Sequence, residues 1–438
     1  MSRLTRKRTK ALGLGELIAI ALGGMVGGGI FSILGISVEQ IGNATPIAIV
    51  IGGMLAFLAA YSYVKLALYY KDEGATYSFF KKTFPHHPGA SSMIGWFVVF
   101  GYISTLALYA FTFSSYLCSQ ISWLDAAWKQ KTVAAVIILL FALINIVSVK
   151  GMGKVEDLLV YSKIIILLFI SGLLAGKGDA DNFLPMWDTD LSFSSVLIVA
   201  SLTFVAYEGF QLVIHAYNEM DEPERNIPRA IYSAILIACI LYVGIAFAAL
   251  SVIPKENIIA DKEYALAAGA KKFLGEFGQF TVIFGALLAT SSAISGTIFG
   301  ASRLMSVIAS DGYLPQVLSK KRKTFIPYNA ILVMSAFAIL LILSGGLELI
   351  LEFGSITFII VSFLMAFSNY KKRKETNSHP LMSILAMFGL FVAAIFIFYF
   401  ESHENAAQLM LILGIYLLLI VGSNVYSRVK KHKLIKQD

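Results

Sequence analysis

The chain has 438 residues, of which 58% are hydrophobic and 14% are charged, with a formal net charge of +8. Soluble domains carry roughly 25% charged residues, so this composition argues against several soluble domains and indicates a membrane-embedded helical bundle. Because the positive charge lies in short loops and tails, it is typical of a membrane topology signal, and we expect no nucleic-acid partner.

We predict about twelve membrane spans, because a helix needs about 20 apolar residues to cross a bilayer. They lie at 15–41, 45–70, 92–121, 132–149, 155–176, 191–218, 227–252, 277–309, 327–343, 346–369, 380–400 and 406–427. Backbone groups within lipid are satisfied only in helices or closed barrels, and these runs are too long for barrel strands. The sequence therefore predicts an all-α polytopic membrane protein.

Basic residues are concentrated in segments that would share one side of the membrane. They include the N-terminal segment 1–14, the loops 320–323 and 371–374, and the tail 428–438. Positive charge favours the cytoplasmic side, so we expect a multi-pass protein of the cell (plasma) membrane with both termini cytoplasmic. Two amphipathic segments, Thr76–Phe84 and Lys262–Phe273, are each expected to form a short interfacial helix or a plain loop.

Glycines are concentrated in the middle of the first span. They are Gly23, Gly24, Gly27, Gly28 and Gly29. Each disfavours a continuous helix by about 1 kcal/mol relative to alanine. Close packing of helices through small residues is one explanation. Three consecutive glycines go beyond what packing needs, so we predict a break in which the free N–H groups of Gly28, Gly29 and Ile30 open a second half-helix.

The sixth span carries Glu208 beside Gly209 near its middle. An ionisable residue inside a span is a functional candidate by default. Glu208 could accept the substrate amino group, select a cationic side chain, carry a proton, or pair with a tyrosine or a backbone N–H. Interrupted helices at matching positions in two halves point to an inverted-repeat transporter with its site at the breaks. Half-helix N-termini suit an anion and unwound carbonyls suit a cation, so a zwitterionic α-amino acid matches both.

Four segments resemble the amino acid–polyamine–organocation superfamily. They are GGMVGGGIFS in the first span, VKGMGKVEDLLVYSKIIIL from Val149 to Leu167, FVAYEGFQ…NEMDEPERNIPRAI from Phe204 to Ile231, and ATSSAISGTIFGASRLMSVIASDGYLP from Ala289 to Pro315. The resemblance spans the first ten helices. Within the superfamily, the chain is similar to the prokaryotic proton-coupled amino acid permeases. It implies a five-plus-five inverted repeat with broken helices 1 and 6. The repeats would be 15–176 and 191–369, with two further helices at 380–427.

Lys163 lies in the middle of the fifth span. A buried ammonium is costly unless it is paired or neutral, and snorkelling to an interface is the alternative. The resemblance implies that this lysine occupies the place of a sodium ion in sodium-coupled relatives. It then implies contact with the carbonyl of Gly23 and the hydroxyl of Ser291 or Ser292, and a role in proton coupling.

The candidate substrate-binding residues are those at the two breaks. They are Val26, Gly27, Gly28, Gly29, Ile30, Val205, Ala206, Tyr207 and Glu208. Lys65 and Glu219, near cytoplasmic helix ends, are candidates for a gate built from an ion pair, or are ordinary loop charges. His215 is interpreted as a packed core histidine or a proton relay. Large aromatic residues are interpreted as core or as walls of the site: Tyr102, Tyr109, Phe113 and Phe299.

The chain contains no zinc-protease, G-x-S-x-G or phosphate-loop motif, so we expect no enzyme activity, no cofactor and no metal site. The predicted function is the movement of amino acids by alternating access, with protons as the coupling ion. An amino acid or amine (polyamine) exchanger is the alternative, and a channel or receptor-like protein is the alternative of another class. The preferred substrate and the oligomeric state stay open.

Overall fold

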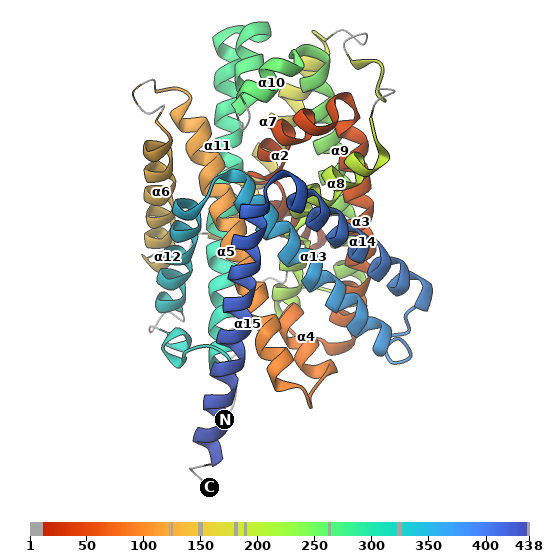
Figure 1. The fold of residues 1–438 in the computed structure, drawn as a ribbon, viewed down its shortest axis with the longest axis vertical. Coiled ribbons are helices and arrows are strands. Elements are labelled where there is room, and N and C mark those ends of the chain that lie inside the picture. The colour runs from red at the N-terminus through yellow and green to blue at the C-terminus, as the bar shows by residue number, and fades with distance from the viewer. Residues whose placement is uncertain are drawn as a thin grey trace.

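The computed structural model describes residues 12–121, 123, 126–147, 152–178, 183–187, 191–261, 264–321 and 326–435. Within these ranges the chain is helical, and its β-type pairing is a single backbone bridge between Leu12 and Met220. Each apolar run of the sequence winds into a helix because a helix satisfies its own backbone N–H and C=O groups. Figure 1 shows many of the helices running roughly along the long axis.

The helices follow one another with short connections. In chain order they are α1 (Leu14–Met25), α2 (Gly29–Ile41), η1 (Gly42–Ala44), α3 (Thr45–Tyr70), α4 (Ala75–Thr83), α5 (Pro88–Cys118), α6 (Ala127–Val147), α7 (Met152–Ala175), α8 (Phe193–Thr203), η4 (Phe204–Tyr207), η5 (Phe210–Glu219), α9 (Pro223–Val252), α10 (Lys255–Asp261), α11 (Ala265–Ser310), η7 (Gln316–Ser319), α12 (Tyr328–Ser344), α13 (Leu347–Lys371), α14 (Pro380–Glu404) and α15 (Ala406–Ile435).

Every predicted span coincides with a helix or with a pair of half-helices. Ten segments of the described chain are long and apolar enough to cross a membrane, and one of them, Gly29–Tyr70, contains both α2 and α3. The shorter apolar helices are α1, which is half of the first span, and α12, which is the ninth. The prediction of an all-α polytopic membrane protein is therefore confirmed.

Helices at matching places in the two halves of the chain pack on one another. Helix α1 lies against η5, α3 lies against α9, and α5 lies against α11. This arrangement is what a five-plus-five repeat would give, although the division into repeats at 15–176 and 191–369 stays a prediction. The two last helices pack on the outside of the bundle. Helix α14 lies against α3, α8 and α13, and helix α15 lies against α5.

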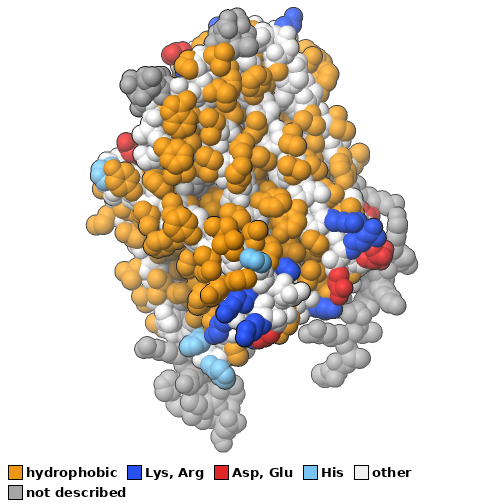
Figure 2. Space-filling view, turned by 90° about the vertical axis from the view of Figure 1, so that its right-hand side faces the viewer, with side chains coloured by type: hydrophobic (Ala, Val, Ile, Leu, Met, Phe, Trp, Pro, Cys, Tyr) orange, Lys and Arg blue, Asp and Glu red, His pale blue; other side chains and the backbone are white. Residues whose placement is uncertain are grey.

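The surface agrees with a lipid environment. Large hydrophobic side chains are exposed on the outward faces of many helices, for example Leu140 of α6, Phe280 of α11 and Leu418 of α15. Figure 2 shows hydrophobic side chains over most of one face, with a group of lysines and arginines towards its lower end. In water such a surface would aggregate, whereas a bilayer covers it.

The structure refines the predicted elements in three places. The segment Thr76–Phe84 is a helix, α4. Of the expected segment Lys262–Phe273, the residues from Ala265 onward form the first part of α11, which is separated from the eighth span by the non-helical Gly275 at φ 71°. The second half of the sixth span is wound as a 3-10 helix, η5, instead of an α-helix. The basic segments 1–11 and 436–438 lie outside the described residues.

Candidate functional site

The first span is broken between α1 and α2. The N–H of Val26 donates to Leu22 O and closes α1, while the N–H of Ser32 donates to Gly28 O and opens α2. The N–H groups at the start of α2, including those of Gly29 and Ile30, therefore have no acceptor within their own helix. The structure thus contains the half-helix N-terminus that the glycine run predicts.

The sixth span is broken at Glu208 and Gly209, also as predicted. Glu208 is extended, and Gly209 has φ 128°, a conformation that side-chain-bearing residues rarely adopt. A Cβ at Gly209 would lie 2.5 Å from the carbonyl carbon of Gly24. The two breaks therefore touch each other through glycine backbones.

The glycine run also serves close packing. A Cβ on Gly27 would lie 2.7 Å from the Tyr109 ring, and one on Gly28 would lie 2.6 Å from the Thr112 hydroxyl. A Cβ on Gly29 would lie 3.1 Å from the Cα of Ala206. The helix break and the tight packing are both present, so the two explanations of this run do not exclude each other.

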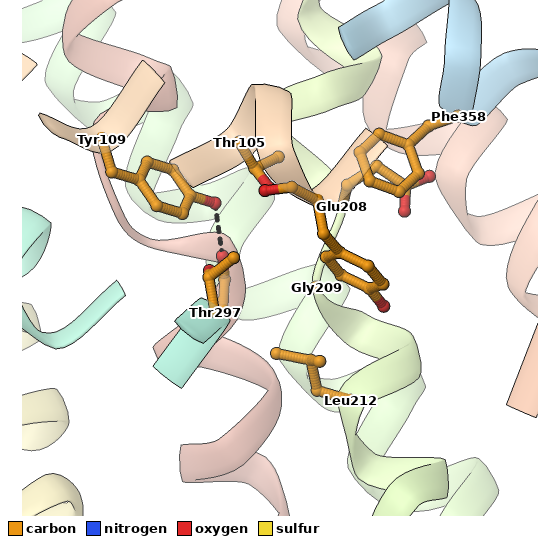
Figure 3. A pocket seen from close by; sticks show the side chains of 9 residues that line it. Thr105, Tyr109, Glu208, Gly209, Leu212, Thr297 and Phe358 are labelled. Carbon is orange, nitrogen blue, oxygen red and sulfur yellow. Dashed lines mark hydrogen bonds between the residues drawn. The ribbon is translucent and has the colours of Figure 1, made fainter. Parts of the chain in front are cut away.

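Two tyrosines hold the carbonyls at the breaks. Tyr109 of α5 donates its hydroxyl to Gly24 O at 2.7 Å, the contact drawn as a dashed line in Figure 3. The Tyr242 hydroxyl of α9 lies 2.7 Å from Met25 O and 2.9 Å from Ala206 O. Because one hydroxyl faces a carbonyl from each break, α9 connects the two broken helices directly.

A small cavity lies where the breaks meet α5, α11 and α13 (Figure 3). Its lining residues are Gly24, Tyr102, Thr105, Tyr109, Glu208, Gly209, Leu212, Thr297 and Phe358. The space open inside it is about 10 Å³, close to the room that one water molecule needs. An amino acid would therefore enter only if the surrounding helices move apart.

Glu208 is the charged group of this cavity, with 2% of its surface exposed. Gln211 donates to Glu208 Oε2 at 2.7 Å and the Ser362 hydroxyl lies beside the carboxyl group, whereas Oε1 accepts no hydrogen bond in the described chain. The buried rings of Tyr63, Tyr102 and Tyr109 surround the carboxyl group. No lysine or arginine of the described residues forms an ion pair with it. A buried carboxylate without a cation is costly, so this group must bind either a proton or a cationic ligand.

Lys163 lies in a separate, fully buried place between α7, α1 and α11. Its Nζ donates to Gly23 O at 3.3 Å and to Ser292 Oγ at 2.8 Å. The contact implied by the family resemblance is therefore present, through Ser292 and not through the half-buried Ser291. The ammonium joins the first broken helix to the eighth span.

The predicted gate residues are not brought together. Lys65 donates to Asn377 O at 2.8 Å, and it forms no ion pair with Glu219. The reason is that Lys65 faces the α13–α14 turn, whereas Glu219 ends η5 and accepts from Leu12 N at 2.9 Å. His215 is half-buried, and its Nδ1 lies 2.6 Å from Glu73 O. This position is at the end of the sixth span and away from the cavity.

Of the predicted binding residues, Glu208 lines the cavity. Val26, Gly27, Gly28, Gly29, Ile30, Val205, Ala206 and Tyr207 are buried beside it in helix packing. Tyr102 and Tyr109 are cavity walls, Phe113 is core, and Phe299 lies under Arg303. Sequence reasoning missed Thr105, Thr297, Phe358 and Tyr242, which reach the breaks from other helices. It also missed Gln211, which lies three residues after Glu208 within the quoted sixth-span segment.

The sequence profile of the amino acid permease family matches residues 12–421. The inner membrane transport protein YbaT of Escherichia coli is 27% identical over 94% of this chain and 96% of its own length. The serine/threonine exchanger SteT of Bacillus subtilis is 25% identical over 87% of this chain and 90% of its own. The cationic amino acid transporter 7 of Arabidopsis thaliana is 24% identical over 86% of this chain and 68% of its own. With the profile covering nearly the whole chain and two broken helices meeting at a buried cavity, this protein belongs to the amino acid permease family.

Proposed function

We propose that the protein binds one α-amino acid between the two helix breaks and carries it across the membrane by alternating access. The observation that carries this proposal is the meeting of Gly24 and Gly209 beside a buried, uncompensated Glu208. Backbone donors at the start of α2 suit a carboxylate, and the carbonyls and carboxyl group of the sixth span suit an ammonium. The narrow cavity supports binding that is accompanied by helix movement.

The printed names of the relatives include neutral and cationic substrates, so they leave the preferred side chain open. In our proposal Glu208 pairs with a positive charge of the substrate, because no lysine or arginine of the described chain lies beside the carboxyl group. An arginine-, lysine- or polyamine-like ligand would satisfy Oε1. If Glu208 instead holds a proton, neutral amino acids would be preferred.

Lys163 is proposed to carry the coupling proton. Its ammonium holds Gly23 of α1 and Ser292 of α11, where it supplies a positive charge and repels a second cation. Loss of the proton would weaken both hydrogen bonds to Lys163 and release α1 from α11. Protonation would therefore favour one of two arrangements of the bundle, which is what symport requires.

We propose that the protein lies in the cell membrane with both termini cytoplasmic, because its loops follow the positive-inside distribution.

The proposal is tested by a ligand screen that measures thermal stabilisation of the purified protein, since a bound substrate raises stability by mass action. Alanine, leucine, arginine and putrescine are the first probes. We expect an amino acid to stabilise the wild type, and arginine to do so more than leucine. In Glu208→Gln this preference for arginine should be lost. An unchanged preference would remove Glu208 from specificity, and stabilisation by no amino acid would contradict the proposed substrate class.

Exchange and channel activity are separated from symport in liposomes. A symporter accumulates labelled substrate in empty liposomes under an ion gradient. An exchanger takes up label only when unlabelled substrate is inside, and a channel gives a large passive flux that does not saturate. The same preparation therefore distinguishes the three mechanisms.

A further inference from the structure

A second buried acidic group lies far from the cavity, between the last three helices. Glu352 of α13 and Glu401 of α14 are in hydrogen-bond contact, with 5% and 1% of their surfaces exposed. Gln408 of α15 donates its amide to Glu352 Oε2. Gln408 also lies beside Glu401, whose Oε2 is buried and has no hydrogen-bond partner in the described chain. The geometry thus places two carboxyl groups against each other with too few donors for two carboxylates.

The charges around this pair are acidic. Glu348 of α13 and Glu404 of α14 face it, Gln408 is the polar group from α15, and no lysine, arginine or histidine of the described helices compensates it. Two carboxylates at hydrogen-bond distance in a buried site cannot both stay ionised, and such a pair retains one proton between its two oxygens. A shared proton also supplies the donor that Glu401 Oε2 otherwise lacks.

The pair lies where α14 ends and α15 begins. Glu401 is within the last turn of α14 and Gln408 within the first turn of α15, and α15 runs from there to the C-terminal end of the chain (Figure 1). Further along α13, Thr357 is hydrogen-bonded to Tyr416 of α15 at 2.7 Å, and its neighbour Phe358 lines the cavity. The same helix therefore carries the acidic pair and one wall of the candidate site.

We propose that Glu352 and Glu401 form a proton-binding site that holds one shared proton, which clamps α14 and α15 onto α13 at this end of the bundle. When the proton leaves, the two carboxylates repel each other and the clamp opens. The site takes its proton from the solution on the side opposite the termini. It requires neither Lys163 nor substrate, so it stands apart from the proposed transport mechanism.

Infrared spectroscopy tests the shared proton directly, because a protonated carboxyl group gives its own C=O stretching band. The measurement uses purified protein near pH 7, in a Glu208→Gln background that removes the other buried carboxyl group among the described residues of the spans. We expect a protonated-carboxyl band in this background, its loss in the added variant Glu401→Gln, and its retention in Glu404→Gln. The Glu404 change removes the same charge from an exposed position on the same helix. If Glu401→Gln does not fold, Glu352→Gln takes its place.

Absence of the band from the background protein, or its persistence after Glu401→Gln, would overturn the proposal. The contribution of the clamp to stability is measured by comparing Tm of the wild type and of Glu401→Gln as the pH rises. A glutamine at 401 donates to Glu352 at every pH, so Tm of Glu401→Gln should fall less than that of the wild type at alkaline pH. Parallel Tm profiles of the two proteins would contradict the clamp. Neither readout depends on transport, so failure here and failure of the proposed function are distinguishable.

Discussion

Gly209 shows at the residue scale why this fold needs glycine at the second break. Its φ of 128° costs about 1–3 kcal/mol for other residues, and an added Cβ would lie 2.5 Å from Gly24 C. We expect Gly209→Ala to lower Tm of the purified protein clearly and to abolish uptake in liposomes. The measurement is a thermal unfolding curve together with an uptake assay.

Gly244 provides the matched control for this change. It lies in α9, and a Cβ there would meet nothing within 4 Å. Alanine favours a helix over glycine by about 0.5–1 kcal/mol, so Gly244→Ala should leave Tm unchanged or raise it slightly. Equal losses in the two variants would mean that the backbone at Gly209 imposes no special requirement.

At the element scale, Tyr242 joins the two broken helices through Met25 O and Ala206 O. Tyr242→Phe leaves both carbonyls without this donor, and a buried unsatisfied group costs about 1–3 kcal/mol. We expect a lower Tm and weaker ligand stabilisation, because the breaks are no longer held together. Tyr399→Phe on the exposed side of α14 is the control and should change neither quantity. A Tyr242→Phe protein with wild-type ligand stabilisation would show that the bridge is dispensable.

The turn before α4 gives a pH-dependent prediction. Burial raises the pKa of Asp72, but hydrogen bonds from Lys82, the Gly74 N–H and Ser78 outweigh burial and hold that pKa below its ordinary value of 3.8. Because the pKa of Asp72 is lower in the folded protein than in the unfolded chain, the ionised carboxylate stabilises the fold at pH values above 3.8. This stabilisation is lost as the pH falls through the pKa of the folded protein. Between about pH 6 and about pH 3, Tm of the wild type should therefore fall more than Tm of Asp72→Asn. Identical slopes would assign the acid sensitivity to other groups.

The sequence predicted the elements well where local chemistry decides. Glycine runs and an ionisable residue in a span located both breaks, because each is locally incompatible with a continuous helix in lipid. The place of Lys163 followed from the family resemblance. The 3-10 winding of η5 was not predicted, because it depends on the backbone of Gly209 and on packing against α1 and α9.

The cavity walls could not be predicted for a related reason. Thr105, Thr297 and Phe358 come from α5, α11 and α13, and each looks like an ordinary residue of an apolar span. The structure does not pair Lys65 with Glu219, because membrane depth alone placed both residues in the prediction. Depth does not fix which side of a helix faces which neighbour, and Lys65 faces Asn377 instead.

On the scale of the whole molecule, two buried polar contacts hold the first broken helix to its neighbours. Lys163 fastens α1 to α11, and Tyr242 fastens α1 to the sixth span through α9. A packed bundle can switch between discrete arrangements when one buried contact changes charge. In this account the proton on Lys163 is that change.

The topology gives a prediction of its own at this scale. If the number of spans is even, the N-terminus and the C-terminus lie on one side, and the positive-inside rule predicts that this side is cytoplasmic. A reporter tag fused to either end should therefore be protected from an external protease in intact cells and cut after the cells are opened. Cleavage of one tag in intact cells would contradict the span count.

The central claim is that proton binding drives amino-acid uptake. It is tested most directly by measuring accumulation of labelled amino acid in proteoliposomes of the purified protein under an inward proton gradient, with sodium absent. The account predicts accumulation above the external concentration, abolished by collapse of the pH gradient and lost or independent of pH in Lys163→Ala. Accumulation driven by an inward sodium gradient without a pH gradient would contradict it.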